Sequence, residues 1–323
     1  MEHIGSAVAK EFLRGNKISI RRRGKRSMSE NKIEISPDFQ ELVQEAENAG
    51  TLEELFEVWK RAHILEVEEW KANKKEGEEQ KPSTVPVAFL NTDIVPSNEL
   101  EETMKNSFCG DGYIGRSGGK DKKYSNWNNG ESEEKRKFKK FFILKEEDHI
   151  QKVVDWERGI QPYNTYFGDW AYDNRKMLVD DDGRPTTSMA AKTAEIARFI
   201  ANERKKNFDW KSKSESAERD RIVALENTAI ININKRGGST EAKANALVNY
   251  AKKYDRFILK EIELLAPAGE TDLEFIVFGK PQNYFEVVKD ILTDKKNGYP
   301  RSKICNLAHP SRVSYKSVET DCK

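Results

Sequence analysis

Four short apolar runs that alternate with helical stretches constrain the fold more than any other feature of the sequence. The runs occupy residues 141–144, 229–233, 273–278 and 303–308. Between them, apolar residues recur at helical spacing over residues 187–206, 240–265 and 285–292. Strands that alternate with helices form a parallel sheet that is covered by helices on both faces. We therefore predict a three-layer α/β/α protein with a central, mainly parallel four-stranded sheet.

An N-terminal helical extension is predicted ahead of this region. Ser36 and Pro37 are typical of a helix start, and Thr51 with Glu54 forms a second start of the capping-box type. A charged stretch follows at residues 71–81. These patterns divide the chain into a basic flexible leader at 1–36, a helical module at 37–80 and an α/β domain at 81–323.

The composition excludes several classes of protein. No apolar run reaches about 18 residues, so we predict no membrane span, and no apolar segment typical of a secretory signal follows Met1. Cys109, Cys305 and Cys322 are an odd, scattered set. Their spacing predicts neither a disulfide framework nor a zinc site and suits a reducing compartment. We therefore expect a cytoplasmic monomer that does not bind a membrane.

The chain carries almost no net charge. With a formal net charge of +1, the field of the whole molecule does not attract nucleic acid. Any such binding must use local basic clusters, which occur at residues 21–26, 135–140 and 235–236. Clusters of this kind are also common on solvated helix faces and tails, so the charges alone leave both interpretations open.

Polar residues follow directly after each of the four apolar runs. In parallel sheets, ligands bind beyond the carboxyl ends of the strands, which meet at one edge. We therefore predict a site at this edge, built from four clusters. The clusters are Glu146, Glu147, Asp148 and His149; Asn232, Asn234, Lys235, Arg236, Gly237 and Gly238; Gly279, Lys280 and Pro281; and His309, Ser311 and Arg312.

The order of these clusters resembles the uracil-DNA glycosylase superfamily, in particular a divergent bacterial branch of it. Residues 108–113 together with 142–146 are similar to the first motif, residues 231–238 to the middle motif, and residues 308–311 to the last motif. The resemblance implies excision of a base from DNA. The chain departs from the family in the first motif, where Glu146, Glu147 and Asp148 replace small residues and proline, and this departure implies an unusual base.

The resemblance also implies roles for these residues. It places the acid that positions water or stabilises the sugar cation on Glu147, with Glu146 and Asp148 as alternatives. Asn232 would read the edge of the base, and His309 would stabilise the departing base. Each assignment has a plainer alternative: a solvated helix N-terminus for the acids, a turn cap for Asn232, and packing or a helix cap for His309.

The remaining contacts follow from the need to hold a flipped nucleotide. Tyr163 or Tyr166 would stack on the base, unless the aromatic segment 162–170 forms a local core. Phosphate contacts, or a wedge into the duplex, would come from six residues. These are Lys235, Arg236, Gly279, Lys280, Ser311 and Arg312.

We expect no metal and no cofactor. The acidic run at residues 180–183 lacks the ligand spacing of a calcium loop and is interpreted as a turn. The three cysteines are too few for the iron–sulfur cluster that some superfamily members carry.

The leading hypothesis is a monofunctional DNA glycosylase that leaves an abasic site in single- or double-stranded DNA. Its target would be a flipped, modified pyrimidine, one candidate being the glucosylated hydroxymethylcytosine of phage DNA, removed as an antiviral defence. Two alternatives remain open at this point. One is a repair enzyme for uracil or another deaminated base, and the other is a nucleic-acid-binding protein that has lost the chemistry.

Overall fold

The computed structural model describes nine segments of the chain, all within one compact unit that spans Ile35–Lys323. The segments are residues 36–72, 112–113, 137–148, 189–210, 212, 214–238, 244–279, 282–309 and 312–322. Tyr163, Tyr166, Lys280 and Ser311 lie outside them, as do residues 1–35 of the leader.

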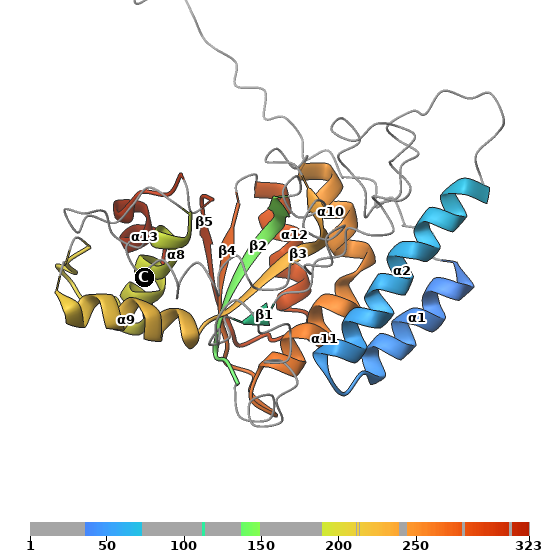
Figure 1. The fold of residues 1–323 in the computed structure, drawn as a ribbon, viewed down its shortest axis with the longest axis horizontal. Helices are drawn as coiled ribbons and strands as arrows, with labels where there is room; N and C mark the ends of the chain where they lie inside the picture. Colours follow the sequence, from blue (N-terminus) through green and yellow to red (C-terminus); the bar gives the residue numbers. More distant parts are fainter. Residues whose placement is uncertain are drawn as a thin grey trace, which may run out of the picture. The chain divides into compact units, whose positions relative to one another are not determined.

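The central sheet has the strand order β1-β3-β2-β4-β5 (Figure 1). Strands β3, β2, β4 and β5 pair in parallel with one another in this order, which confirms the predicted four parallel strands. Strand β1 pairs antiparallel with β3 at the edge of the sheet. The sequence did not predict it, because a strand of two residues is too short to show an alternation of apolar and polar residues. The strands are β1 Gly112–Tyr113, β2 Lys140–Asp148, β3 Ala229–Gly238, β4 Glu274–Phe278 and β5 Lys303–Leu307.

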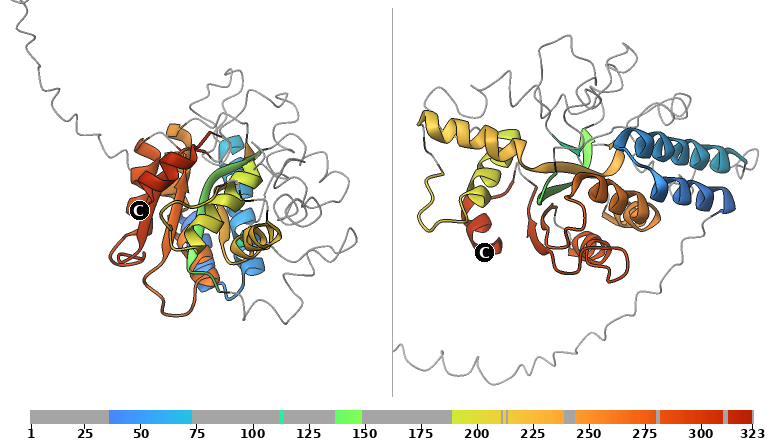
Figure 2. Two further views of the ribbon diagram at one scale, coloured as in Figure 1. Left: turned by 90° about the vertical axis from the view of Figure 1, so that its left-hand side faces the viewer. Right: turned by 90° about the horizontal axis from the view of Figure 1, so that it is seen from below.

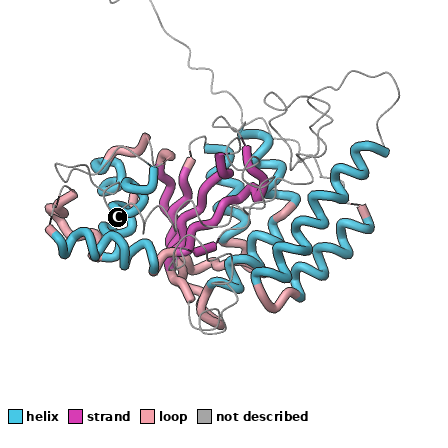
Figure 3. Tube along the Cα trace, viewed as in Figure 1, coloured by secondary structure: helices cyan, strands magenta, loops and turns pink. Residues whose placement is uncertain are grey.

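Both faces of the sheet are covered by helices (Figure 3). Alternate side chains along β2 join different hydrophobic clusters: Phe141 and Ile143 lie in one, Phe142 and Leu144 in the other. The first cluster includes residues of α1 Pro37–Asn48, α2 Leu52–Ala72, α10 Ala244–Lys253, α11 Asp255–Leu265 and α12 Gln282–Leu292. The second includes residues of α8 Met189–Ala201, α9 Glu215–Glu226 and α13 Tyr315–Asp321. None of the helices described is long and apolar enough to cross a membrane.

The helix predicted at residues 240–265 is in fact two helices. Helix α10 ends at Lys253 and α11 begins at Asp255, with Tyr254 between them as the N-cap. Apolar residues on both sides of the break face the same cluster, so the helical spacing continues through it and gives no sign of the interruption.

The N-terminal helices begin where the sequence predicts. The Ser36 hydroxyl accepts the Phe39 N–H at 3.3 Å, and Thr51 and Glu54 form a reciprocal capping box with N···O distances of 3.2 and 3.3 Å. Phe39 and Trp59 then pack in the same cluster as the sheet. Helix α2 also contacts α11 (Figure 2), so these helices share the core, while the proposed domain boundaries stay a prediction.

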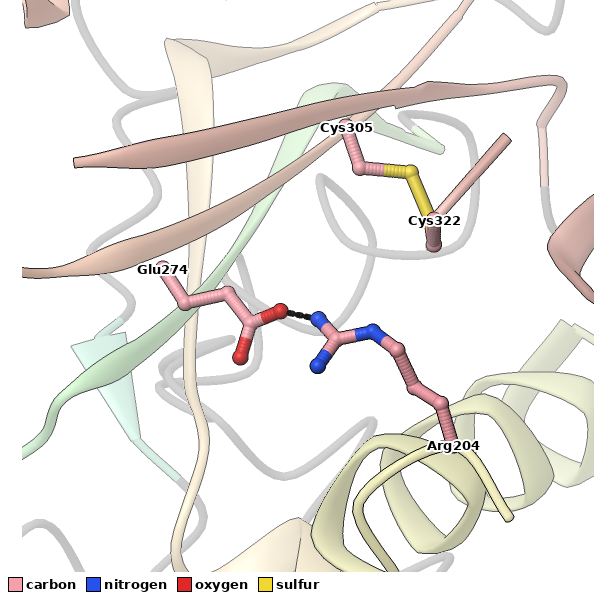
Figure 4. The surroundings of a disulfide bond; sticks show 4 residues. All are labelled: Arg204, Glu274, Cys305 and Cys322. Atoms are coloured by element: carbon pink, nitrogen blue, oxygen red, sulfur yellow. Dashed lines mark ion pairs between the residues drawn. A yellow bond between two sulfur atoms is a disulfide. The ribbon is translucent and has the colours of Figure 1, made fainter. Parts of the chain in front are cut away.

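Two of the three cysteines form a disulfide, so the sequence-based prediction was wrong for this pair. Cys305 on β5 is bonded to Cys322 at the C-cap of α13, with the Cα atoms 5.3 Å apart (Figure 4). The turn after β5 reverses the chain and brings α13 back beside its own strand. The two cysteines are 17 positions apart in the sequence, and no pattern in that stretch predicts that the chain reverses. Figure 4 also shows an ion pair between Arg204 and Glu274, which ties the segment after α8 to the start of β4.

Reduction of the disulfide is expected to destabilise the protein. Opening a closed loop of this size restores conformational freedom to the unfolded chain and costs about 3 kcal/mol of unfolding free energy. Urea unfolding with and without a dithiol reductant measures the loss, and Cys305→Ser/Cys322→Ser should match the reduced wild type. Titration of the urea-unfolded, unreduced chain should find one free thiol among three cysteines; three free thiols would contradict the bond.

Buried tyrosines should make the fold sensitive to alkali. Burial raises the pKa of the Tyr250 and Tyr254 phenols well above their usual range and raises that of Tyr315 to about 12. Above pH of about 10 the unfolded chain loses phenolic protons that the folded chain retains, so the unfolding free energy falls as the pH rises. Urea midpoints measured from about pH 8 to about pH 11 should show this decline, with a shallower slope for Tyr254→Phe.

Candidate functional site

The carboxyl ends of the four parallel strands lie at one edge of the sheet, as predicted. The register pairs Leu144 on β2 with Asn232 on β3, and Phe278 on β4 with Leu307 on β5. The four polar clusters follow directly from these positions. The candidate site is therefore a row of strand ends contributed by segments far apart in the sequence.

The end of β2 is longer and less regular than the sequence indicates. The strand runs to Asp148 instead of ending at Leu144, and its register with β3 shifts between Glu146, opposite Asn234, and Asp148, opposite Gly238. The backbone of the acidic cluster is thus in a strand, and the interpretation as a helix N-terminus is wrong. Such irregularities are common beside functional sites. The side chains of Glu146, Glu147 and Asp148 lie outside the described part.

Two buried asparagines lie within β3, and Asn232 is level with the end of β4. Asn232 is 3% exposed and Asn234 is 2% exposed. They occupy alternate positions after Ile230, which packs in the second cluster, so they face the side of the sheet covered by α8. An amide can donate and accept hydrogen bonds at once, which suits it to the edge of a planar base. Asn234 had no predicted role, although it stands in the same sequence cluster.

His309 follows β5 in a tight turn. Its carbonyl oxygen accepts the N–H groups of Arg312 at 2.8 Å and Val313 at 3.0 Å, and its side chain is half-buried. Val313 is buried in the second cluster and its carbonyl accepts the Lys192 ammonium at 3.0 Å. Arg312 is exposed, which is compatible with a phosphate contact. The turn is therefore fixed on α8 while the arginine stays in contact with solvent.

Gly279 joins the ends of β4 and β5. Its N–H donates to the Leu307 carbonyl at 2.8 Å, two residues before His309. Its φ of 136° lies in a region that side-chain-bearing residues rarely adopt. The predicted position at the site is consistent with this geometry, and the backbone conformation explains why a glycine is needed there.

Lys235 does not contact phosphate, contrary to the prediction. It is fully buried, and its ammonium lies 2.7 Å from a Glu261 carboxylate oxygen on α11. The reason is that β3 continues to Gly238, so Lys235 belongs to the strand and points toward the first cluster, like Ile231 and Ile233. Arg236 also belongs to β3, and its side chain lies outside the described part.

Two residues at this edge were missed by sequence reasoning. Lys192 holds the turn after His309, as described above. The buried Tyr284 of α12 donates its hydroxyl hydrogen to the Leu144 carbonyl at 3.3 Å, immediately before the acidic end of β2. Both act on main-chain carbonyls, and no residue pattern signals such contacts.

Helix α8 is held in place by a buried charged cluster. Glu195 forms ion pairs with Arg198 at 2.9 Å and with Arg221 of α9. Arg221 also donates to the Ser212 carbonyl at 2.6 Å. Burial is the largest influence on Glu195 and raises the pKa of its carboxyl group, although both arginines act in the opposite direction. The cluster fixes the helix that carries Lys192.

The functional groups toward this edge are the amides of Asn232 and Asn234 and the imidazole of His309, on β3 and after β5 with β2 and β4 between them. Such groups can donate and accept hydrogen bonds. Among the described residues, no group of three or more histidine, cysteine, aspartate or glutamate side chains is placed to hold a metal ion. Comparisons of the chain with models of protein families, with curated proteins and with solved structures find no match. The argument for function therefore rests on the residues of this edge.

Substitution of Gly279 by alanine should disturb this edge specifically. A side chain at its φ of 136° is strained, which should cost about 1–3 kcal/mol of unfolding free energy. Gly269 also has a positive φ, 72°, but lies in the turn between α11 and β4 with open space around it. Gly269→Ala is therefore the matched control. Hydrogen exchange should quicken at residues 305–309 and 312–313 in Gly279→Ala only; equal exchange in both variants would contradict the role of Gly279.

Proposed function

We propose that this chain is a DNA glycosylase of the uracil-DNA glycosylase superfamily that removes a flipped, modified pyrimidine and leaves an abasic site. The observation that carries the proposal is the placement of the buried Asn232 amide and the half-buried His309 imidazole toward the same edge of one parallel sheet, on β3 and after β5, with β2 and β4 between them. The three-layer arrangement with its N-terminal helical extension, the cytoplasmic location and the monomeric state belong to the same proposal.

The chemistry assigns a separate task to residues from three of the four strands. Water adds to the sugar carbon C1′ as the bond from C1′ to the base nitrogen breaks, and the electron pair of that bond leaves with the base. His309 donates a hydrogen bond to the base as it acquires negative charge. Asn232 reads the edge of the base. Glu147, or its neighbours Glu146 and Asp148, positions the water and stabilises the positive sugar.

The acidic end of β2 supports a modified base as the substrate. In this chain the first motif continues as strand to Asp148, with a shifted register opposite β3, where the superfamily motif has small residues and proline. Three carboxylate-bearing residues at the end of this strand favour a base that carries extra polar groups over plain uracil. Glucosylated hydroxymethylcytosine has such groups, because its sugar offers hydroxyls to carboxylate acceptors.

The proposal is tested by incubating the full chain with matched DNAs, in single- and double-stranded form. The DNAs carry cytosine, uracil, hydroxymethylcytosine or its glucosylated form, and alkali then cleaves any abasic site. We expect strand cleavage only with the modified cytosines. Release from uracil-DNA would instead support the repair alternative. Binding without abasic sites on any of the DNAs would overturn the enzymatic proposal and leave a binding protein.

His309→Ala should reduce turnover without a matching loss of DNA affinity. A group that stabilises the leaving base acts mainly in the transition state, so kcat should fall by about 10²–10⁴-fold while the Kd for DNA changes little. Single-turnover base release and DNA binding measure the two quantities. The matched control is Lys316→Ala on α13, an exposed residue beyond the turn. A variant that keeps the wild-type rate would remove His309 from the mechanism.

A further inference from the structure

Strand β3 presents different chemistry on its two faces. Asn232 and Asn234 face the α8 side, where the candidate site lies, whereas Ile233 and Lys235 face the side covered by α2, α10 and α11. All four side chains are buried. Because they alternate along one strand, any shift of Lys235 along or across the sheet also moves the two asparagines.

Lys235 is held by a carboxylate inside an aromatic enclosure. Its ammonium lies 2.8 and 2.7 Å from the two carboxylate oxygens of Glu261, and neither side chain is exposed. The rings of Phe56 and Trp59, both on α2, have centroids 5.7 and 5.2 Å from the same ammonium. These distances suit attraction between a cation and an aromatic face. Helices α2 and α11 thus fix the end of this side chain.

The main chain of Lys235 is held by a second contact. The Tyr250 hydroxyl of α10 accepts the Lys235 N–H at 3.4 Å and the Trp59 indole N–H at 2.9 Å. It also lies 2.9 Å from His63 Nε2. A hydroxyl has two acceptor positions and one hydrogen, so the hydrogen is left to donate to His63 Nε2. Burial raises the pKa of Tyr250 well above its usual range, which keeps the phenol neutral for this task.

An ion pair in this place is a poor means of stabilising the fold. Removing two charges from water costs several kcal/mol, and well-packed apolar side chains of similar volume often stabilise a core as well or better. An ion pair does, however, accept far fewer arrangements than an apolar contact, since both charges must stay within hydrogen-bond distance. The observed contacts therefore favour a role in geometry.

We propose that Lys235 and Glu261 are positioning residues that set the place of Asn232 and Asn234 within β3. Helix α2 contributes to this through Trp59, so the N-terminal helices act as a buttress behind the site. This inference rests on the proposed function for its effect on catalysis. The structural part of the inference, which is the fixed position of Asn232 and Asn234 in β3, can be measured without any assay of base release.

The test separates stability from positioning. Lys235→Met alone should lower the urea midpoint, because it leaves the Glu261 carboxylate buried without its cation. Lys235→Met/Glu261→Met should return the midpoint to the wild-type value or above it, because no buried charge of the pair remains. If the pair positions the strand, the double variant should nevertheless show a kcat lowered by about 10- to 100-fold with little change in KM.

The matched control is another buried ion pair, which joins α10 to α2. Lys253 on α10 pairs with Glu66 on α2, and its ammonium lies 4.5 Å from the centroid of the Phe39 ring. This pair does not include a residue of β3. Lys253→Met/Glu66→Met should therefore fold stably and keep the wild-type kcat.

Hydrogen exchange gives the second readout, and it needs no activity. In the double variant, amides of residues 231–236 should exchange at least about tenfold faster than in the wild type, at equal global stability. Wild-type kcat together with unchanged exchange in Lys235→Met/Glu261→Met would overturn the inference. If the wild type releases no base from any DNA, the proposed function fails and the exchange result alone decides the role of the pair.

Discussion

The covering of every central strand on both faces is the constraint on which the rest of this structure depends. Along β2, Phe141 and Phe142 are both essentially buried although they point in opposite directions. A sheet enclosed in this way has no free face for a ligand, and its parallel strands leave their carboxyl ends together at one edge. Polar side chains that follow the strands are thereby collected in one place, whatever their separation in the sequence.

This constraint explains which features could be predicted from the sequence. The four parallel strands and the caps at Ser36 and Thr51 are local patterns, because apolar runs and capping residues act within a few positions. The placement of Asn232 and His309 toward the same edge of the sheet then follows from parallel order alone. None of these inferences requires knowledge of which side chains touch across the core.

The features that were missed depend on where a strand ends or on how distant segments meet. Lys235 was expected at the surface because β3 was expected to end at Ile233; five further residues of strand placed it in the core. A lysine two positions beyond an apolar run is usually exposed. Its partner Glu261 belongs to a helix 26 residues further on, and no local pattern joins the two. The Cys305–Cys322 bond was missed for the same reason.

The two parts of the candidate site are held from opposite sides of the sheet. Asn232 belongs to a strand fixed from behind by Glu261 and Tyr250, in the cluster of α2, α10 and α11. The turn after His309 is fixed on the other side by Lys192 of α8, and the disulfide closes the loop that contains it. The distance between an amide that would read a base and an imidazole that would stabilise its departure is thus set by two separately packed layers.

This division has a mechanistic consequence. Catalysis by positioned groups loses rate steeply when their separation changes by about 1 Å, even if binding persists. A single cluster that held both groups would couple their positions, so that a shift of one would carry the other with it. In the described part of the chain the two clusters lie on opposite faces of a hydrogen-bonded sheet, so the sheet is the element that sets the distance. The buried anchors of β3 and the closed loop after β5 both act on that element, which is why interactions remote from the edge belong to the description of the site.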